Sequence, residues 1–378
     1  MTNPFKYGGI VDQDSFCNRE KELAHLKRAI ENGDRLFLYS ERRFGKTSLV
    51  KRVLQQLPKS RILGVYIDLW PTDGEVSLAI AVAKAITESL ASTADKMLET
   101  AQKFFVRLLP AVTADSSGNP QINFSLREQP VEPQGLDEVL RVPGIIAEKR
   151  SRKVVLIFDE FQRILEYSTD RAERTLRSAI QDQRSVSFIF LGSKKHLIQK
   201  MFLDQNRPLY RSGGHYPLGS IHINSWKPFI NGHFRASGKQ IDDQAITMIC
   251  GQTSGHPFYT QHLCHAVWEL CEPGGSVDNA MIEKAIDLLL EREGYAYTSL
   301  WDTFSLNQRR LLQGLAIEHP DVELFGSNFA RQYHLRSASS VQRAADNLLA
   351  HDIIDRDGSK YFISDRFFKI WIRRNTQG

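Results

Sequence analysis

The sequence has little of the features that mark membrane, secreted or metal-clustered proteins. Only four of its 378 residues are cysteines, and they lack the paired close spacing of a disulfide framework or a zinc site. No apolar run approaches the roughly 18 residues that a membrane helix needs, and the opening residues, Met-Thr-Asn-Pro-Phe-Lys, contain no apolar signal segment. We therefore expect a soluble protein of a reducing compartment, most simply the cytoplasm, with no membrane partner.

A large excess of one charge sign is also missing. The chain has 49 basic and 44 acidic side chains and a formal net charge of +5. This mild excess permits an anionic partner such as nucleic acid but does not require one. Hydrophobic residues make up 42% of the chain, enough to build proper cores, and the length suggests about two or three domains.

What the sequence does contain is a basic loop, residues 40–47, between a predicted strand at 36–39 and a predicted helix. The loop reads Ser-Glu-Arg-Arg-Phe-Gly-Lys-Thr, and apolar residues at helical spacing follow it until Pro58. Unpaired N–H groups at the start of such a helix attract polyphosphate. We expect Lys46 to reach the β- and γ-phosphates of ATP and the Thr47 hydroxyl to ligate Mg²⁺. The remaining residues expected around the nucleotide here are Arg42, Arg43, Phe44, Gly45 and Ser48.

The loop by itself is weak support for a nucleotide site. The phosphate-loop pattern G-x-x-x-x-G-K-[ST] begins with glycine, and Ser40 stands at that position here. The alternative interpretation is an ordinary basic turn before a surface helix. The flanking strand and helix, together with a second motif at Asp159, favour the phosphate loop.

The second motif is an apolar run at 154–158 followed at once by two carboxylates, Asp159 and Glu160. Such a run indicates a central buried strand, and open α/β sheets place ligands at the carboxyl ends of their strands. We expect Asp159 to hold Mg²⁺, directly or through water, and Glu160 to polarise the attacking water. The alternative is a plain solvated strand end.

A further buried strand is predicted at 186–192, and it stops on Ser193. Ser193 could contact the attacking water or the γ-phosphate, or it could be a turn serine without such a contact. Residues 219–223 are the candidate for a fifth strand. Several cations nearby could serve as a catalytic finger, of which we select Arg207; the others are Lys194, Lys195 and Arg211.

Two other regions have a predicted role. The apolar N-terminal segment that contains Val11 and Phe16 could line the adenine-binding site, or it could simply be an N-terminus that packs against the rest of the protein. Residues 306–374 show the order of elements that is typical of a winged helix, with predicted helices at 307–317, 327–333 and 337–351 and two predicted strands on either side of Asp357-Gly358. Asp-Gly between strands is a strong hairpin signal.

In their order and spacing, these motifs resemble the archaeal-type ATPases of the STAND division of AAA+-related P-loop proteins. The resemblance spans nearly the whole chain, and it implies that the Gly-His-Pro turn at 255–257 sits in a helical lid, where His256 senses the phosphates. The alternative for that turn is a helix break with a proline start. The motifs that carry the resemblance are Asn-Pro-Phe at 3–5, Phe-Cys-Asn-Arg-Glu at 16–20, residues 42–49, residues 158–161, and residues 191–193 with Arg-Pro-Leu-Tyr at 207–210.

We therefore predict an α/β fold: a P-loop core with a parallel five-stranded sheet at 1–224, including an insertion near 70–150, a helical lid at 225–300 and a winged-helix domain at 301–378. ATP hydrolysis with Mg²⁺ would drive a conformational switch. The winged helix would contact an unknown protein partner or a second copy of the chain, with DNA as the alternative. Competing interpretations are a nucleotide-gated regulatory module with little turnover, against which Glu160 argues, and a DNA-handling helper.

Overall fold

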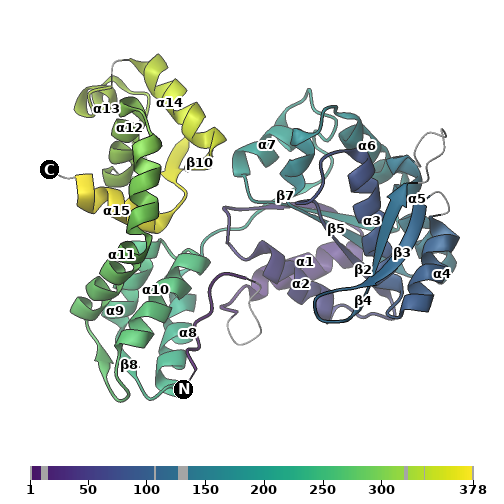
Figure 1. Cartoon of the computed structure of the whole chain (residues 1–378), viewed down its shortest axis with the longest axis horizontal. Coiled ribbons are helices and arrows are strands. Elements are labelled where there is room, and N and C mark those ends of the chain that lie inside the picture. Colours follow the sequence, from purple (N-terminus) through teal and green to yellow (C-terminus); the bar gives the residue numbers. More distant parts are fainter. Residues whose placement is uncertain are drawn as a thin grey trace. The chain divides into compact units, whose positions relative to one another are not determined.

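The computed structural model describes residues 2–9, 16–105, 108–126, 135–318, 322–335 and 337–376 (Figure 1). The chain forms two compact units. The first, here called the core unit, consists of Glu20–Ser40 and Lys46–Leu218. The second, here called the helical unit, consists of Met1–Arg19, Glu41–Gly45 and Gly219–Gly378.

The core unit is built on a five-stranded sheet with the order β2-β5-β6-β1-β7, and all of its strand pairs are parallel. The predicted α/β fold with a parallel five-stranded sheet is thereby confirmed. The central strands β5 and β6 are almost wholly buried because helices cover both faces, which explains their continuous apolar sequence. The strands are β1 Arg35–Tyr39, β2 Ile62–Asp68, β5 Lys153–Asp159, β6 Val186–Gly192 and β7 Gly214–Pro217.

The fifth strand is not the one predicted at 219–223. It is β7, which lies beside β1 at the edge of the sheet. The residues 219–222 form no strand, and His222 instead caps helix α8 by accepting a hydrogen bond from the Asn224 N–H. The prediction was wrong because β7 is mostly exposed and polar and ends in Pro217. An edge strand tolerates proline and needs no apolar run.

Helices cover the two faces of the sheet with different side chains. Alternate residues such as Phe37, Val65 and Phe190 belong to a core that α3, α5 and α6 complete. Helix α2 packs on the other face, where a Cβ atom at Gly64 would come within 2.4 Å of the Leu54 Cδ2. The helices of this unit are α1 Glu20–Asn32, α2 Lys46–Gln56, α3 Glu75–Leu90, α4 Ala94–Phe104, α5 Leu136–Arg150, α6 Arg171–Asp182 and α7 Lys195–Leu203, with the 3-10 helix η1 Phe161–Glu166.

The region of the predicted insertion contains a separate antiparallel pair, β3 Leu108–Ala114 and β4 Pro120–Leu126. The pair packs against α3 and α4 and buries Ile122 in the main core of the unit. Residues 127–134 lie outside the described part of the chain. Helix α5 begins at Leu136, within the region of the predicted insertion.

The helical unit has one continuous core of its own, formed mainly by helices (Figure 1, green to yellow). Its two smaller sheets are β8 Gln240–Ile241 with β9 Ser276–Val277, and β10 Ile354–Asp357 with β11 Lys360–Ile363. Among the described residues, no helix has the length and apolar content to cross a membrane. The helices are α8 Ile223–Ala236, α9 Asp243–Thr253, α10 Pro257–Leu270, α11 Asn279–Thr303, α12 Leu306–Ile317, α13 Ser327–Gln332, α14 Ala338–Ala350 and α15 Arg366–Thr376.

The C-terminal part of this unit has the order predicted for a winged helix. Helices α12, α13 and α14 and the hairpin β10–β11 begin and end within three residues of the predicted bounds. Gly358 adopts a φ of +62° in the hairpin turn, a conformation that glycine reaches without the cost of a side chain. The three-domain division at 224 and 300 stays a prediction.

Candidate nucleotide site

Parallel pairing places the predicted site residues of the core unit at one edge of the sheet. Tyr39 lies opposite Gly192, and Asp68 lies opposite Asp159, so β1, β2, β5 and β6 end at the same edge. Ser40 and Ser193 follow directly in the sequence. This is the edge where open α/β sheets bind their ligands.

Lys46 is the first residue of α2, and its side chain is almost fully buried. Its Nζ donates a hydrogen bond to the Ser40 Oγ at 3.0 Å. Ser40 is itself inaccessible to solvent. The serine that replaces the first glycine of the phosphate-loop pattern therefore supplies an acceptor for the lysine of that pattern.

Thr47 and Asp159 are brought together as the sequence predicts. The Thr47 hydroxyl donates to the Asp159 Oδ2 at 2.6 Å, and the Tyr66 hydroxyl donates to the same oxygen at 2.6 Å. The Glu160 N–H donates to the Asp159 Oδ1 at 2.9 Å. Burial, with the Asp159 carboxylate as the next cause, raises the pKa of the Tyr66 hydroxyl far above its usual range, so Tyr66 remains a donor.

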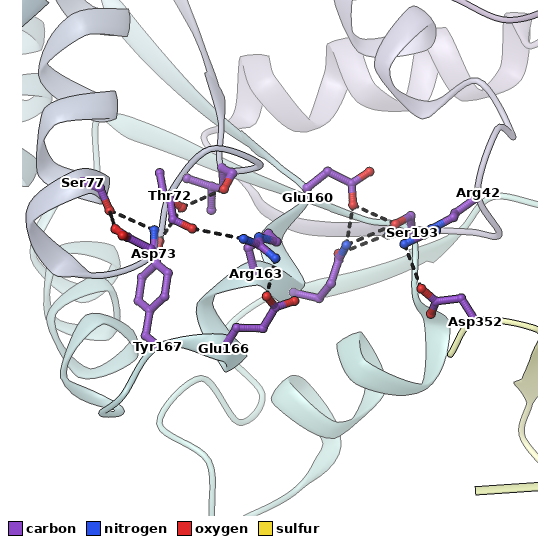
Figure 2. Close-up of polar contacts among 12 residues, drawn as sticks. Arg42, Thr72, Asp73, Ser77, Glu160, Arg163, Glu166, Tyr167, Ser193 and Asp352 are labelled. Carbon is purple, nitrogen blue, oxygen red and sulfur yellow. Dashed lines mark hydrogen bonds and ion pairs between the residues drawn. The ribbon is translucent and has the colours of Figure 1, made fainter. Parts of the chain in front are cut away.

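Glu160 and Ser193 point toward one another from the ends of β5 and β6 (Figure 2). The Ser193 Oγ donates to the Glu160 Oε2 at 2.7 Å, and Gln162 Nε2 donates to both the Glu160 Oε2 and the Ser193 Oγ. Glu160 has a φ of +53°, an unusual conformation for a residue with a side chain, and such strain of about 1–3 kcal/mol clusters at functional sites. The turn aims the carboxylate at the Ser193 hydroxyl.

The loop that follows β2 is tied to η1 by a network of polar contacts (Figure 2). The Tyr167 hydroxyl donates to the Thr72 Oγ1 at 2.6 Å, and the Ser77 Oγ donates to the Asp73 Oδ1 at 2.7 Å. Arg163 and Glu166, which both belong to η1, form an ion pair. The Tyr167 hydroxyl thereby links the residue after η1 to the loop, whereas the Ser77–Asp73 and Arg163–Glu166 contacts are local to the start of α3 and to η1.

The candidate finger Arg207 has a different partner in this structure. Its guanidinium forms an ion pair with Glu173 of α6, whose side chain is almost fully buried. The Arg207 side chain is itself 24% exposed. To act on a nucleotide, Arg207 would have to give up this pairing, so its role as a finger stays a prediction.

The loop residues Glu41–Gly45 belong to the helical unit together with His256. The Phe258 N–H donates to the His256 Nδ1 at 3.2 Å, which places the ring proton on Nε2, and this atom donates to the Arg42 carbonyl at 3.1 Å. Phe44 packs edge-on against the His256 ring, with centroids 4.4 Å apart. His256 therefore both caps α10 before Pro257 and contacts the phosphate-loop backbone.

Charged side chains of the same loop pair with residues near the C-terminus of the helical unit. Arg366 pairs with Glu41 at 2.7 Å, and both side chains are largely buried. Arg42 pairs with Asp352 at 3.0 Å. The Arg43 guanidinium lies 4.3 Å from the centroid of the Phe258 ring, and Gly45 adopts a φ of +82°.

The predicted adenine segment is described only in part. Val11 lies outside the described residues. Phe16 is half-buried, and Cys17 packs in the core of the helical unit, where burial raises the pKa of its thiol to about 12. The four cysteines are free and buried. Ser48 is buried on the first turn of α2.

Sequence reasoning missed two residues of the site, Tyr66 and Gln162. A weak signal existed for Tyr66, because the period of two in β2 places it on the same face as Asp68, beside the predicted end of β5. Gln162 gave no signal, since its contact with Ser193 joins residues 31 positions apart.

The fold agrees with comparisons to known proteins. Residues 16–181 match the model of an ATPase domain predominantly from Archaea, and residues 295–374 match that of a probable winged helix domain. No curated protein matches the chain at a significant level.

Two solved structures show the same fold over nearly the whole chain. A Walker-type ATPase of Pyrococcus abyssi is 18% identical, with 98% of this chain and 99% of that chain covered and a TM-score of 0.66. The ORC2 protein of Aeropyrum pernix, solved as ADPNP-ADP complexes, is 12% identical, with 95% and 94% covered and a TM-score of 0.54. The chain thus contains an ATPase domain of the archaeal type, followed by a winged helix domain.

Proposed function

We propose that this protein binds ATP and hydrolyses it with Mg²⁺, and that the reaction drives a conformational switch. The observation that carries the proposal is the hydrogen bond between the Thr47 hydroxyl and the Asp159 carboxylate, which unites the phosphate-loop helix with the end of β5. The carboxylate of Glu160 follows at the same sheet edge, bonded to Ser193.

The donor atoms fit magnesium. A hydroxyl and a carboxylate are hard oxygen ligands, the kind that Mg²⁺ takes in phosphate-transfer sites, where it also keeps several waters. Thr47 and Asp159 would hold the ion. When bound, it would neutralise charge on the β- and γ-phosphate oxygens.

The other residues of the chain have separate tasks in this proposal. Lys46 would exchange its hydrogen bond with Ser40 for one with the phosphates, aided by the N-terminus of α2. Glu160 would orient the attacking water and take its proton, while Ser193 and Gln162 hold the carboxylate in place. Arg207 would supply further positive charge only after leaving Glu173.

Two other observations support the nucleotide and the switch. The ORC2 structure of the same fold contains ADPNP and ADP. Within the helical unit, the loop residues Glu41 and Arg42 form ion pairs with Arg366 and Asp352. A loop that rearranges around phosphates would alter those pairs, and the winged helix would pass the change to a protein partner or a second copy.

One observation favours DNA as the second candidate partner. A hollow of about 410 Å³ lies on α12 and α14, and the residues around it are mostly polar. Arginine, asparagine and glutamine are the side chains that read base edges most often. The hollow is lined by Ser305, Asn307, Gln308, Ser340, Arg343, Ala344 and Asn347.

The test is a measurement of ATP affinity and turnover, with and without Mg²⁺, for the full chain and for Lys46→Ala. The wild type should bind ATP, and it should release phosphate only when the metal is present. Lys46→Ala should lose ATP binding because Lys46 contacts the phosphates in the ground state. Absence of ATP binding by the wild type would refute the proposal. ATP binding without turnover would leave the regulatory module as the better interpretation.

A further inference from the structure

We infer that Tyr66 is a positioning residue for magnesium, acting through the carboxylate of Asp159. The inference rests on the proposed function, since it concerns how the same site holds its metal. Its basis is the Tyr66 hydroxyl, which donates to the Asp159 Oδ2 at 2.6 Å, as close as the Thr47 hydroxyl does.

The position of Tyr66 follows from the packing of β2 under α2. Gly64 and Tyr66 share a face of β2, and the absence of a side chain at Gly64 lets Leu54 of α2 approach the strand closely. The Lys51 Nζ lies 4.9 Å from the centroid of the Tyr66 ring. The ring thus contacts Lys51 of α2, and its hydroxyl reaches Asp159 at the end of the neighbouring strand β5.

The hydrogen bonds to Asp159 fix the orientation of its carboxylate. Oδ2 accepts from both Thr47 and Tyr66, and Oδ1 accepts from the Glu160 N–H. A carboxylate has about four acceptor positions in all. Among the described residues, two donors contact Oδ2 and one contacts Oδ1, so the second acceptor position of Oδ1 would be available to a metal-bound water.

The contribution of Tyr66 differs from that of Thr47. The Thr47 oxygen would itself contact the metal, whereas the Tyr66 hydroxyl would act only on the carboxylate. Without the Tyr66 hydroxyl, Oδ2 would accept from Thr47 alone. The Asp159 carboxylate could then rotate more easily about its Cβ–Cγ bond. Outer partners of this kind typically contribute about 10- to 100-fold to metal affinity.

The experiment compares Tyr66→Phe with Tyr167→Phe in the full chain. Both changes remove one tyrosine hydroxyl of the core unit that makes a 2.6 Å hydrogen bond, but Tyr167 donates to Thr72 and not to Asp159. Mn²⁺, followed by its electron paramagnetic resonance, is titrated into each protein with ATP, and ATP affinity is also measured with chelator. Thermal unfolding reports any general loss of stability.

We expect Tyr66→Phe to bind Mn²⁺ about 10- to 100-fold more weakly, with metal-free ATP affinity unchanged, and Tyr167→Phe to bind the metal like the wild type. Equal metal affinity in wild type and Tyr66→Phe, or equal losses in the two variants, would overturn the inference. A wild type that binds metal-free ATP but no metal would refute it as well, and a wild type that binds no ATP would refute the proposed function and the inference together.

A double-mutant cycle separates positioning from a loss of folding. Because Tyr66 acts through Asp159, Tyr66→Phe should weaken metal binding no further in a chain that already contains Asp159→Asn. Additive losses in the double variant would show that Tyr66 acts by some other route and would overturn the inference. Unchanged binding relative to Asp159→Asn alone supports it.

Discussion

Glu160→Gln separates the chemistry of the proposed reaction from nucleotide binding. The amide oxygen of glutamine has nearly the shape of a carboxylate oxygen, and it can still accept the hydrogen bonds that Ser193 and Gln162 now donate to Oε2. The left-handed backbone of residue 160 is equally costly for either side chain. We therefore expect fold and ATP affinity to be retained.

The same change removes the group that takes the proton from water. General-base catalysis contributes about 10²- to 10⁴-fold, and since a tenfold change in rate corresponds to about 1.4 kcal/mol, the activation free energy should rise by roughly 3–5 kcal/mol. The assay is phosphate release at saturating ATP and Mg²⁺, with ATP affinity measured on the same protein. The variant should accumulate unhydrolysed ATP.

Glu166→Gln is the matched control. Glu166 lies on the adjoining 3-10 helix and pairs with Arg163, and its side chain is 50% exposed. The same chemical change there should leave turnover within about twofold, because exposed ion pairs contribute little. A loss of turnover below about tenfold in Glu160→Gln, or an equal loss of ATP affinity, would refute the role given to Glu160.

Three other outcomes are expected. Ser40→Gly removes one acceptor of the buried Lys46 ammonium, the hydroxyl at 3.0 Å, and keeps the backbone carbonyl at 3.5 Å, so the free protein should lose about 0.5–1.5 kcal/mol in denaturant titrations and recover part of it with ATP; an unchanged midpoint would contradict this. Burial lowers the pKa of His262 to about 4, whereas the unfolded residue takes up its proton near pH 6.5. The free energy of unfolding should therefore keep its full value above pH 6.5 and fall as the pH drops toward 4. The decline should be smaller in His262→Phe. If the winged helix binds duplex DNA through phosphates, affinity must fall with salt by a slope of about 0.9 per contact; full chain and Arg343→Ala titrated at two salt concentrations test this, and an unchanged slope in the variant would exclude Arg343.

Local patterns in the sequence were sufficient for the central strands, the phosphate-loop helix and the winged-helix hairpin. Strands β5 and β6 are buried on both faces, so their apolar character is continuous and their ends are marked by Asp159 and Ser193. Parallel pairing at a common edge then requires the residues after those strands to lie near one another. The Thr47–Asp159 and Glu160–Ser193 contacts follow from that rule.

Only the tertiary structure decided which partner each polar side chain takes. The Tyr66 hydroxyl donates to Asp159, which lies 93 positions further along the chain. Arg207 pairs with Glu173 and is therefore engaged elsewhere than at the predicted nucleotide. Such contacts depend on which strands are neighbours and on how closely a helix approaches the sheet. Edge strand β7 was misplaced for a related reason, because a strand exposed to solvent has no need of the apolar run by which buried strands are recognised.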